Sequence, residues 1–419
     1  MDEKEGVKRP FIYRYNAFCR FISGDYKSQG VVDRLGYWAV LTLLKISTGF
    51  IMVMIALAGV RSISDFCDVS INLVSFLTIE VYALLFVLRG EAFNAIVSKL
   101  ASLWLEAIQN VRTLREQSRV EKCVWSIRII VPLLNSGAFA IFIGYATAPI
   151  VLFFTSTSKN RRMGLPFKMA KFLEHTDHST VICIYVIAVA CLSYSCFIII
   201  NLNALYLSML CTLDAGLHLT SLFMCRAYEN RWVYANRKTA DKYSVTMTDF
   251  QLGLDLKRSF VRHQQWLRAA MELKHVMNER FLVLHMGTIT VTTLASFLTA
   301  NDPAHHYYQI AMAFIPLGIY FLFFFKATSI SATAGQFTAD RLYFCHMRMP
   351  ALMKIDSKTF LFIMRRLQRP VFFEIGKIWH LSLMRFVSIL QHIFSVIMLL
   401  RSINNRTMSP SVNGEIEVT

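Results

Sequence analysis

Four polar side chains in the last hydrophobic stretch of the chain have the spacing of one helix face. They are Ser388, Gln391, His392 and Ser395, at i, i+3, i+4 and i+7 within the otherwise apolar run Phe386–Leu400. Lipid cannot satisfy hydroxyl, amide and imidazole groups, so such a stripe must face protein or water. Two interpretations stay open: the stripe lines a polar path through a membrane, or it hydrogen-bonds to neighbouring helices.

Other residues that could carry chemistry form weaker patterns. There is no Gly-rich phosphate loop, no His-Glu-x-x-His and no Cys-x-x-Cys, so we predict neither an enzyme nor a cofactor. A zinc site between two outer loops is conceivable, with His175 and His178 in one loop and His305 and His306 in the other, but loop histidines without a third ligand are usually plain surface residues. We therefore predict no metal site.

Lys45 and Glu80 are the clearest charges inside apolar stretches. At similar depths in two consecutive spans they would form an ion pair, which we favour; the alternative is that Glu80 serves a transport path.

The elements that position these residues are membrane helices. The sequence is 55% hydrophobic and only 17% charged, whereas soluble domains carry about 25% charged residues. A span needs about 20 mostly apolar residues, and seven stretches qualify, the last of them short. They are Tyr37–Val60, Val69–Leu88, Ile129–Phe154, Thr180–Leu210, Phe281–Ala300, Tyr308–Phe325 and Phe386–Leu400.

The distribution of basic residues gives the orientation. Of the 44 Lys and Arg residues, 35 lie in four segments that fall on one side of the membrane. Because cytoplasmic loops accumulate Lys and Arg, we predict a cytoplasmic N-terminus and an extracellular C-terminus. This also explains the net charge of +17 without nucleic acid, since the basic residues are not gathered on one face. We expect no secretory signal peptide, because the first long apolar run can act as a signal-anchor.

The predicted fold is thus an all-α membrane protein whose cytoplasmic segments form helical stalks. Apolar periodicity predicts helix through 91–120 and two helices in 211–280, joined near 236–244. The stalks would pack into an anchor domain. The chain then divides into a cytoplasmic N-terminus (1–36), spans one to four (37–210, with stalk 89–128), stalks (211–280), spans five and six (281–325), anchor helices (326–385), span seven (386–400) and an outer tail (401–419). Asn405 begins a possible glycosylation site in that tail.

This architecture resembles the insect gustatory receptor family, relatives of the insect odorant receptors. The likeness is clearest from Leu361 to Ser402, where Phe372, Gly376 and Leu381 match the lead-in to the family's last span. The family's Thr-Tyr and Gln-Phe pairs are replaced by Phe394-Ser395 and Arg401-Ser402 with the spacing kept, so the chain resembles a divergent member.

The resemblance implies a tetrameric, ligand-gated, non-selective cation channel in the plasma membrane of chemosensory neurons. Each subunit would give its last span to a central pore lined by the polar stripe, and Pro370–Leu383 would join the cytoplasmic hub. A small-molecule tastant would bind in the outer half of spans two to six. Candidate pocket residues, chosen by depth, are Asn72, Phe76, Tyr145, Tyr185, Thr293, Phe297 and Phe314, each of which could equally serve core packing.

Arg401 is the main departure from this family. With Ser402 it would lie at the outer pore mouth, where a positive charge repels cations. We therefore expect this chain to assemble with other gustatory receptor subunits in a heteromer. Membrane lipid is the other expected partner. Many divergent members are tuned to bitter compounds, so we expect a bitter-type ligand.

Two alternatives use the same spans. A G-protein-coupled receptor needs an outer N-terminus, against the charge bias, and usually an outer disulfide, for which only Cys67 is available. A secondary transporter would more often show paired halves with broken spans.

Overall fold

A computed structural model describes residues 63–155, 178–237, 242–302, 309–348, 357–368 and 371–408, with four isolated positions between 41 and 53. The elements are, in chain order, α4 (Ile63–Leu88), α5 (Gly90–Gln109), α6 (Leu114–Thr155), α8 (His178–Arg237), α9 (Lys242–Asn301), α10 (Gln309–Ala332), the π-helix η1 (Thr333–Phe337), α11 (Thr338–Met347), α12 (Ser357–Leu367), β1 (Glu374–Ile375), β2 (Trp379–His380) and α13 (Leu383–Met408).

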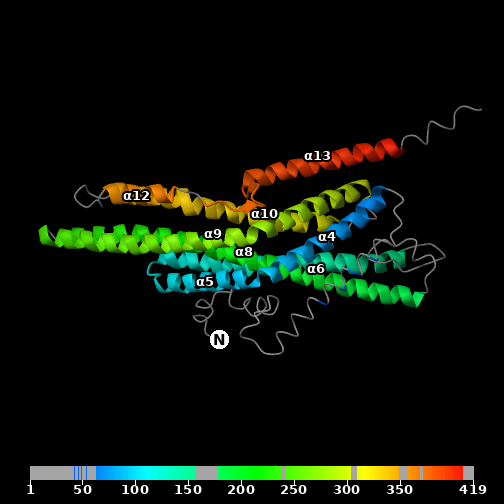
Figure 1. Cartoon of the computed structure of the whole chain (residues 1–419), viewed down its shortest axis with the longest axis horizontal. Helices are drawn as coiled ribbons and strands as arrows, with labels where there is room; N and C mark the ends of the chain where they lie inside the picture. Colours follow the sequence, from blue (N-terminus) through cyan, green and yellow to red (C-terminus); the bar gives the residue numbers. More distant parts are fainter. Residues whose placement is uncertain are drawn as a thin grey trace, which may run out of the picture.

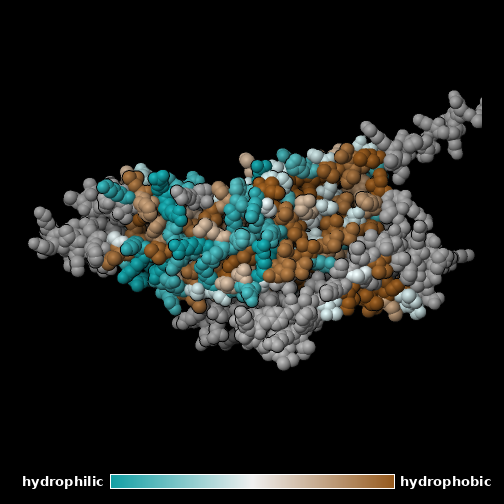
Figure 2. Space-filling view, viewed as in Figure 1, coloured by the Kyte–Doolittle hydropathy of each residue, from teal (hydrophilic) through white to brown (hydrophobic). Residues whose placement is uncertain are grey.

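Two helices of 60 residues each, α8 and α9, run along the length of the described part (Figure 1). At 1.5 Å per residue each is about 90 Å long, far more than a bilayer requires. Figure 2 shows the consequence: apolar surface gathers where α4, α10 and α13 lie, and polar surface covers the section with α5. The long helices therefore cross the membrane and continue as stalks. They meet between Arg237 and Lys242, inside the stretch predicted for their junction.

Five helices of the described part are long and apolar enough to cross a membrane, namely α4, α8, α9, the α10–α11 rod and α13. The third predicted span, 129–154, lies within α6. Apart from the four isolated positions, the first predicted span and its Lys45 lie outside the described residues, as do 303–308 with His305 and His306. The count of seven and the orientation remain predictions.

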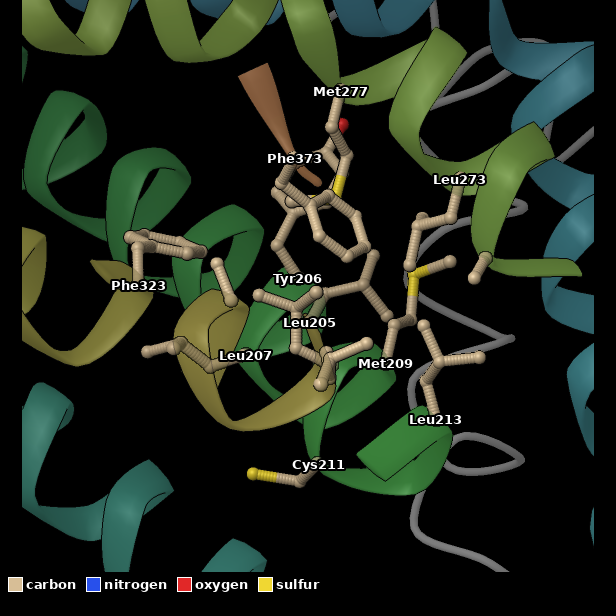
Figure 3. Packing of buried hydrophobic residues seen from close by; sticks show 14 of the residues in the cluster. Leu205, Tyr206, Leu207, Met209, Cys211, Leu213, Leu273, Met277, Phe323 and Phe373 are labelled. Atoms are coloured by element: carbon tan, nitrogen blue, oxygen red, sulfur yellow. The ribbon is translucent and has the colours of Figure 1, made fainter. Parts of the chain in front are cut away.

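The core forms where α8 passes from the membrane section into the stalk. Apolar side chains on successive faces of α8 pack into one cluster with residues of α9 and α10, and Leu205, Leu207 and Met209 are among them (Figure 3). Leu273 and Met277 come from α9, Phe323 from α10. Because α8 is buried all round here, it serves as the central helix of the subunit.

The predicted helix through 91–120 is wrong in one respect: it is broken between α5 and α6. At the start of α6, Thr113 Oγ1 accepts from the Glu116 amide at 3.3 Å, and Glu116 Oε2 accepts from the Thr113 amide at 3.2 Å. This reciprocal pair is a capping box, which starts a new helix. The chain can therefore reverse, and α6 returns toward the membrane beside α8.

The all-α prediction also needs a correction, because residues 374–380 form a small antiparallel hairpin. Its turn places Gly376 and Lys377 at φ of 59° and 62°. The Gly376 amide donates to the Asn278 carbonyl at 3.4 Å, and the Lys377 amide donates to Asn278 Oδ1 at 3.0 Å. The hairpin is thus fastened to α9.

The last span is longer than predicted. Helix α13 has 26 residues, about 39 Å, so it can cross the membrane fully. It continues through Asn405 to Met408, so the beginning of the predicted outer tail is helical and only its later part lies outside the described residues.

Candidate functional site

A cavity of about 120 Å³ lies between four helices in the membrane section. Cavities on the order of 150 Å³ hold a molecule the size of benzene, so the space suits a single ring. Its walls are almost entirely apolar. They comprise Asn72, Ser75, Phe76, Thr78 and Ile79 of α4, Cys196, Ile199, Ile200 and Asn203 of α8, Leu284, Gly287, Thr288 and Val291 of α9, and Met312, Ile315, Pro316 and Ile319 of α10.

Two residues with special backbone properties shape this cavity. Pro316 has no amide hydrogen, so the Met312 carbonyl one turn earlier loses its helical partner at the cavity wall. Gly287 lets α9 approach α4 closely, because a Cβ there would overlap the Thr78 side chain. The cavity therefore combines a loosened helix with a tight helix contact.

A few polar groups interrupt the apolar wall. Ser75 Oγ is buried, and no hydrogen-bond partner for it is found within the residues that the structure describes. Asn203 Oδ1 accepts from the Tyr82 hydroxyl at 3.2 Å, while Asn72 Nδ2 donates to the Asp68 carbonyl at 2.9 Å. A bound molecule with one hydroxyl could hydrogen-bond to Ser75 while its body contacts apolar wall.

The structure brings only some of the predicted pocket residues to this cavity. Asn72 and Phe76 line it. Thr293 and Phe297 are buried further along α9, where Phe297 packs in a separate cluster with Cys67 and Ile71.

The other three candidates lie elsewhere. The Tyr185 hydroxyl donates to the Ala146 carbonyl of α6, and Phe314 is 67% exposed on α10. Tyr145 is on α6, but its side chain lies outside the description. The candidates were chosen by their depth in the predicted spans, and this criterion did not identify Ser75, Gly287 and Pro316. A Gly and a Pro inside apolar runs are nevertheless sequence signals for a close helix approach and for a kink.

The second candidate site is the exposed face of α13. Phe386, Ile389 and Ile393 form its buried face, and Phe386 contacts Phe321 and Phe324 of α10. At about 100° per residue, the predicted stripe of Ser388, Gln391, His392 and Ser395 lies on the opposite side. Ser388 is half-buried, and the other three are exposed. The stripe points away from the rest of its own subunit.

The two serines of this stripe donate back to their own helix. Ser388 Oγ donates to the Met384 carbonyl at 3.3 Å, and Ser395 Oγ donates to the Gln391 carbonyl at 2.9 Å. These bonds leave the amide of Gln391 and the ring of His392 as the groups that need an outside partner. Of the predicted outer-mouth residues, Ser402 continues the stripe, whereas Arg401 projects about 130° around the helix from its centre.

Among the described residues, no group of three or more His, Cys, Asp or Glu side chains could hold a metal ion. The eight cysteines in these ranges are free thiols. Burial raises the pKa of the Cys123 thiol, which donates to the Cys211 carbonyl at 3.5 Å.

Comparison with known proteins gives the family. The family model of the 7tm odorant receptor matches residues 62–394, most of the chain. The chain belongs to the 7tm odorant receptor family. It is thus a multi-pass membrane protein of a family of chemosensory receptors and ion channels, not of enzymes. A search of curated proteins found no match.

Solved structures of this family share the fold. The insect olfactory receptor OR5 from Machilis hrabei matches with a TM-score of 0.70 and 11% identity, over 94% of this chain and 98% of that one. Its complex with eugenol matches with a TM-score of 0.71 and 11% identity, over 96% and 100%. At this identity the likeness establishes the fold, whereas ligand and assembly need separate arguments.

Proposed function

We propose that this odorant-receptor family member is a subunit of a ligand-gated, non-selective cation channel that detects a small apolar compound. The permeation path would run along the exposed stripe of α13, and the ligand would occupy the cavity between α4, α8, α9 and α10. The chain would act as a gustatory receptor for bitter compounds of low polarity. The family match disfavours a G-protein-coupled receptor or a transporter.

The observation that carries this proposal is the orientation of α13. Its apolar residues Phe386, Ile389 and Ile393 face the subunit, and its polar stripe faces outward. If α13 met lipid on that side, the Gln391 amide and His392 ring would be unsatisfied, at a cost of several kcal/mol. Copies of the helix surrounding a water-filled path remove this cost, which requires an oligomer. The tetramer, homomeric or mixed, is the arrangement we propose.

The wall of the cavity supports the ligand class. It carries hydroxyl and amide groups but no charged side chain, so a cationic ligand would lose its hydration without compensation. Eugenol, which is bound in the Machilis hrabei receptor, is a ring compound with a hydroxyl group and would suit such walls. We propose a neutral ring compound with one hydrogen-bonding group.

A single helix connects the cavity to the start of α13. Leu284, Gly287 and Thr288 of α9 line the cavity, and Asn278, less than two turns away, accepts the turn amides of the β1–β2 hairpin. Only two residues separate the hairpin from α13. A ligand that shifts α9 would therefore move the base of the pore helix.

The test is a recording of ligand-evoked current from cells that express the chain, alone and with candidate partner subunits. Gln391→Ala should change conductance, ion selectivity or block by polyvalent cations. Val396→Ala is the matched control, because Val396 is exposed on the same helix but lies off the stripe. Saturable uptake without current would contradict the channel, and equal behaviour of both variants would contradict the assignment of the stripe.

A further inference from the structure

Arg280 carries a buried charge at the start of the apolar run of α9. The residue is 2% exposed, and the apolar residues begin directly after it at Phe281. Within the described residues, no carboxylate forms an ion pair with Arg280, and its Nε atom has no hydrogen-bond partner. A buried guanidinium without a counter-ion is costly, so such a group at the border of a membrane span requires a functional explanation.

Aromatic rings from three other helices surround this charge. The guanidinium carbon lies 5.4 Å from three ring centroids, those of Phe86 on α4, Phe93 on α5 and Tyr206 on α8. Phe93 packs edge-on against the other two rings, with centroids 4.8 Å from Phe86 and 5.3 Å from Tyr206. Cation–π contacts of this kind offset part of the lost hydration. Arg280 therefore joins α4, α5 and α8 to α9 at one point.

Two hydrogen bonds fix the direction of the guanidinium group. Its Nη1 atom donates to the hydroxyl of Tyr206, and its Nη2 atom donates to the carbonyl of Leu85 at 2.9 Å. Leu85 belongs to the last turn of α4, where the helix dipole favours a positive charge. The planar fork of an arginine can hold both acceptors at once, whereas the compact ammonium group of a lysine cannot. Arg280 thus holds the end of α4 in place relative to α8.

Tyr82 links this group of residues to the ligand cavity. Its ring packs against the ring of Tyr206 with centroids 5.9 Å apart, and its hydroxyl donates to Asn203 Oδ1 at 3.2 Å. Asn203 is one of the polar residues in the cavity wall. Two side chains, Tyr82 and Tyr206, therefore connect the wall of the cavity to Arg280.

On its other side, Arg280 lies close to the hairpin that precedes α13. Asn278, two residues earlier on α9, accepts the backbone amides of Gly376 and Lys377 in the turn of this hairpin. Because α9 is a continuous helix here, a displacement of Arg280 also displaces Asn278, which is less than one turn away. The hairpin would then move at the base of α13.

We propose that Arg280 is a positioning residue that couples occupancy of the cavity to the hairpin at the base of α13, through Tyr82 and Tyr206. This role rests on the proposed channel function, and it adds α4 and α8 to the direct connection through α9. A ligand that displaces Asn203 also shifts the two tyrosines. The guanidinium cannot release its acceptors without leaving a buried charge unsatisfied, so α9 follows.

The first measurement needs no ligand. Hydrogen exchange in the hairpin, residues 374–380, is followed in the purified full-length chain in lipid nanodiscs for Tyr82→Phe, Tyr206→Phe and the double variant. Tyr82→Phe removes only a hydroxyl beside the cavity wall, yet exchange in the hairpin should become about fivefold faster, as expected for one lost hydrogen bond. In the Tyr206→Phe background the same change should add nothing. Additive effects, or no effect of either change, would overturn the proposal.

The second measurement is the current evoked by phenol, a small neutral ring with one hydroxyl group. Tyr206→Phe should raise the half-activating concentration about tenfold, because a hydrogen bond to a charged group is lost, and phenol binding to the purified chain should stay within about twofold. Arg280→Lys, which keeps the charge without the fork, should act in the same way. A parallel loss of binding and current would overturn the positioning role.

Absence of phenol-evoked current in the unchanged chain would count against the proposed ligand class or channel function. The hydrogen-exchange measurement then decides alone on the connection between the cavity and the hairpin, because it depends on neither. The two failures are therefore distinguishable.

Two control variants separate this role from general stability. Arg89→Gln breaks an exposed ion pair with Glu279, and Tyr228→Phe removes a buried hydroxyl that lies 3.4 Å from His346 Nδ1, in the stalk part of α8. Both should leave hairpin exchange and phenol activation within about twofold of the unchanged chain, since the ion pair is exposed and Tyr228 is outside the connection. Equal effects of Tyr228→Phe and Tyr206→Phe would overturn the proposal.

Discussion

The indole ring of Trp379 in β2 is nearly perpendicular to the imidazole ring of His285 on α9, with the ring centroids 5.4 Å apart. His285 also hydrogen-bonds to the hydroxyl of Tyr320 on α10. The hairpin that precedes α13 thereby contacts α9 directly and is linked through His285 to α10, and both are among the four helices that line the cavity.

Trp379→Ala should weaken the coupling of ligand to current. Perpendicular aromatic pairs contribute about 0.5–1.5 kcal/mol, so the half-activating ligand concentration should rise about two- to thirteenfold. Binding of the ligand itself, measured on purified protein, should change little. Ile378→Ala is the control, because Ile378 is 68% exposed in the same hairpin. Equal activation curves for Trp379→Ala and the unchanged chain would contradict coupling of the ligand to the pore helix through the contact between Trp379 and His285.

Gly287→Ala should destabilise the membrane section and abolish the ligand response. The added methyl group overlaps Thr78, and overpacking of this kind costs about 1–3 kcal/mol. Gly318→Ala on α10 is the matched control, since a Cβ there meets nothing within 4 Å. That change should leave thermal stability equal or slightly higher, because Gly lowers helix stability by about 1 kcal/mol. Equal melting temperatures for the two variants would show that the close contact between α9 and α4 at Gly287 does not contribute to stability.

Ser75→Ala should separate ligands by their polar group. The hydroxyl is buried without a partner in the described residues, so its removal should not lower stability. A phenol that donates to Ser75 should activate about tenfold less well, whereas its analogue without the hydroxyl should be unaffected. This pair of dose–response curves tests the cavity directly; parallel shifts for both compounds would place the ligand elsewhere.

Glu116→Gln should lower thermal stability strongly. Glu116 is 1% exposed, pairs with Arg226 and caps α6, and loss of one partner of a buried pair costs about 3–5 kcal/mol. Glu272→Gln breaks the exposed pair with Lys99 and should cost about 1 kcal/mol or less. Melting of the two variants in detergent should differ clearly, and similar melting temperatures would contradict this role for Glu116.

Sequence periodicity predicted the long stalks and the junction of α8 and α9, because local apolar spacing determines where a helix has a face to bury. The sequence also contains the residues of the capping box, Thr113 and Glu116. The prediction of one continuous helix followed instead the apolar periodicity that runs on both sides of this pair. The hairpin was not predicted, since two-residue strands have no periodicity. The two positive φ angles at Gly376 and Lys377 depend on contacts with Asn278.

The cavity depends on tertiary packing, and depth in a span does not tell which way a side chain points. Asn72 and Phe76 have the right depth and the right face, whereas Phe314 has only the depth. The stripe of α13 was readable because four polar residues on one face stand out in an apolar helix. The direction in which this face points comes from the packing of Phe386 on α10.

The most direct test of the pore assignment is cysteine accessibility during ligand-evoked current. Gln391→Cys, Ser395→Cys and the off-stripe variant Val396→Cys are each treated with a charged, water-soluble thiol reagent, with the unsubstituted chain as background. We predict irreversible loss of current for Gln391→Cys and Ser395→Cys, and no more than the background change for Val396→Cys. Modification of Val396→Cys alone, or of none of the three while current is present, would contradict a permeation path along the polar face of α13.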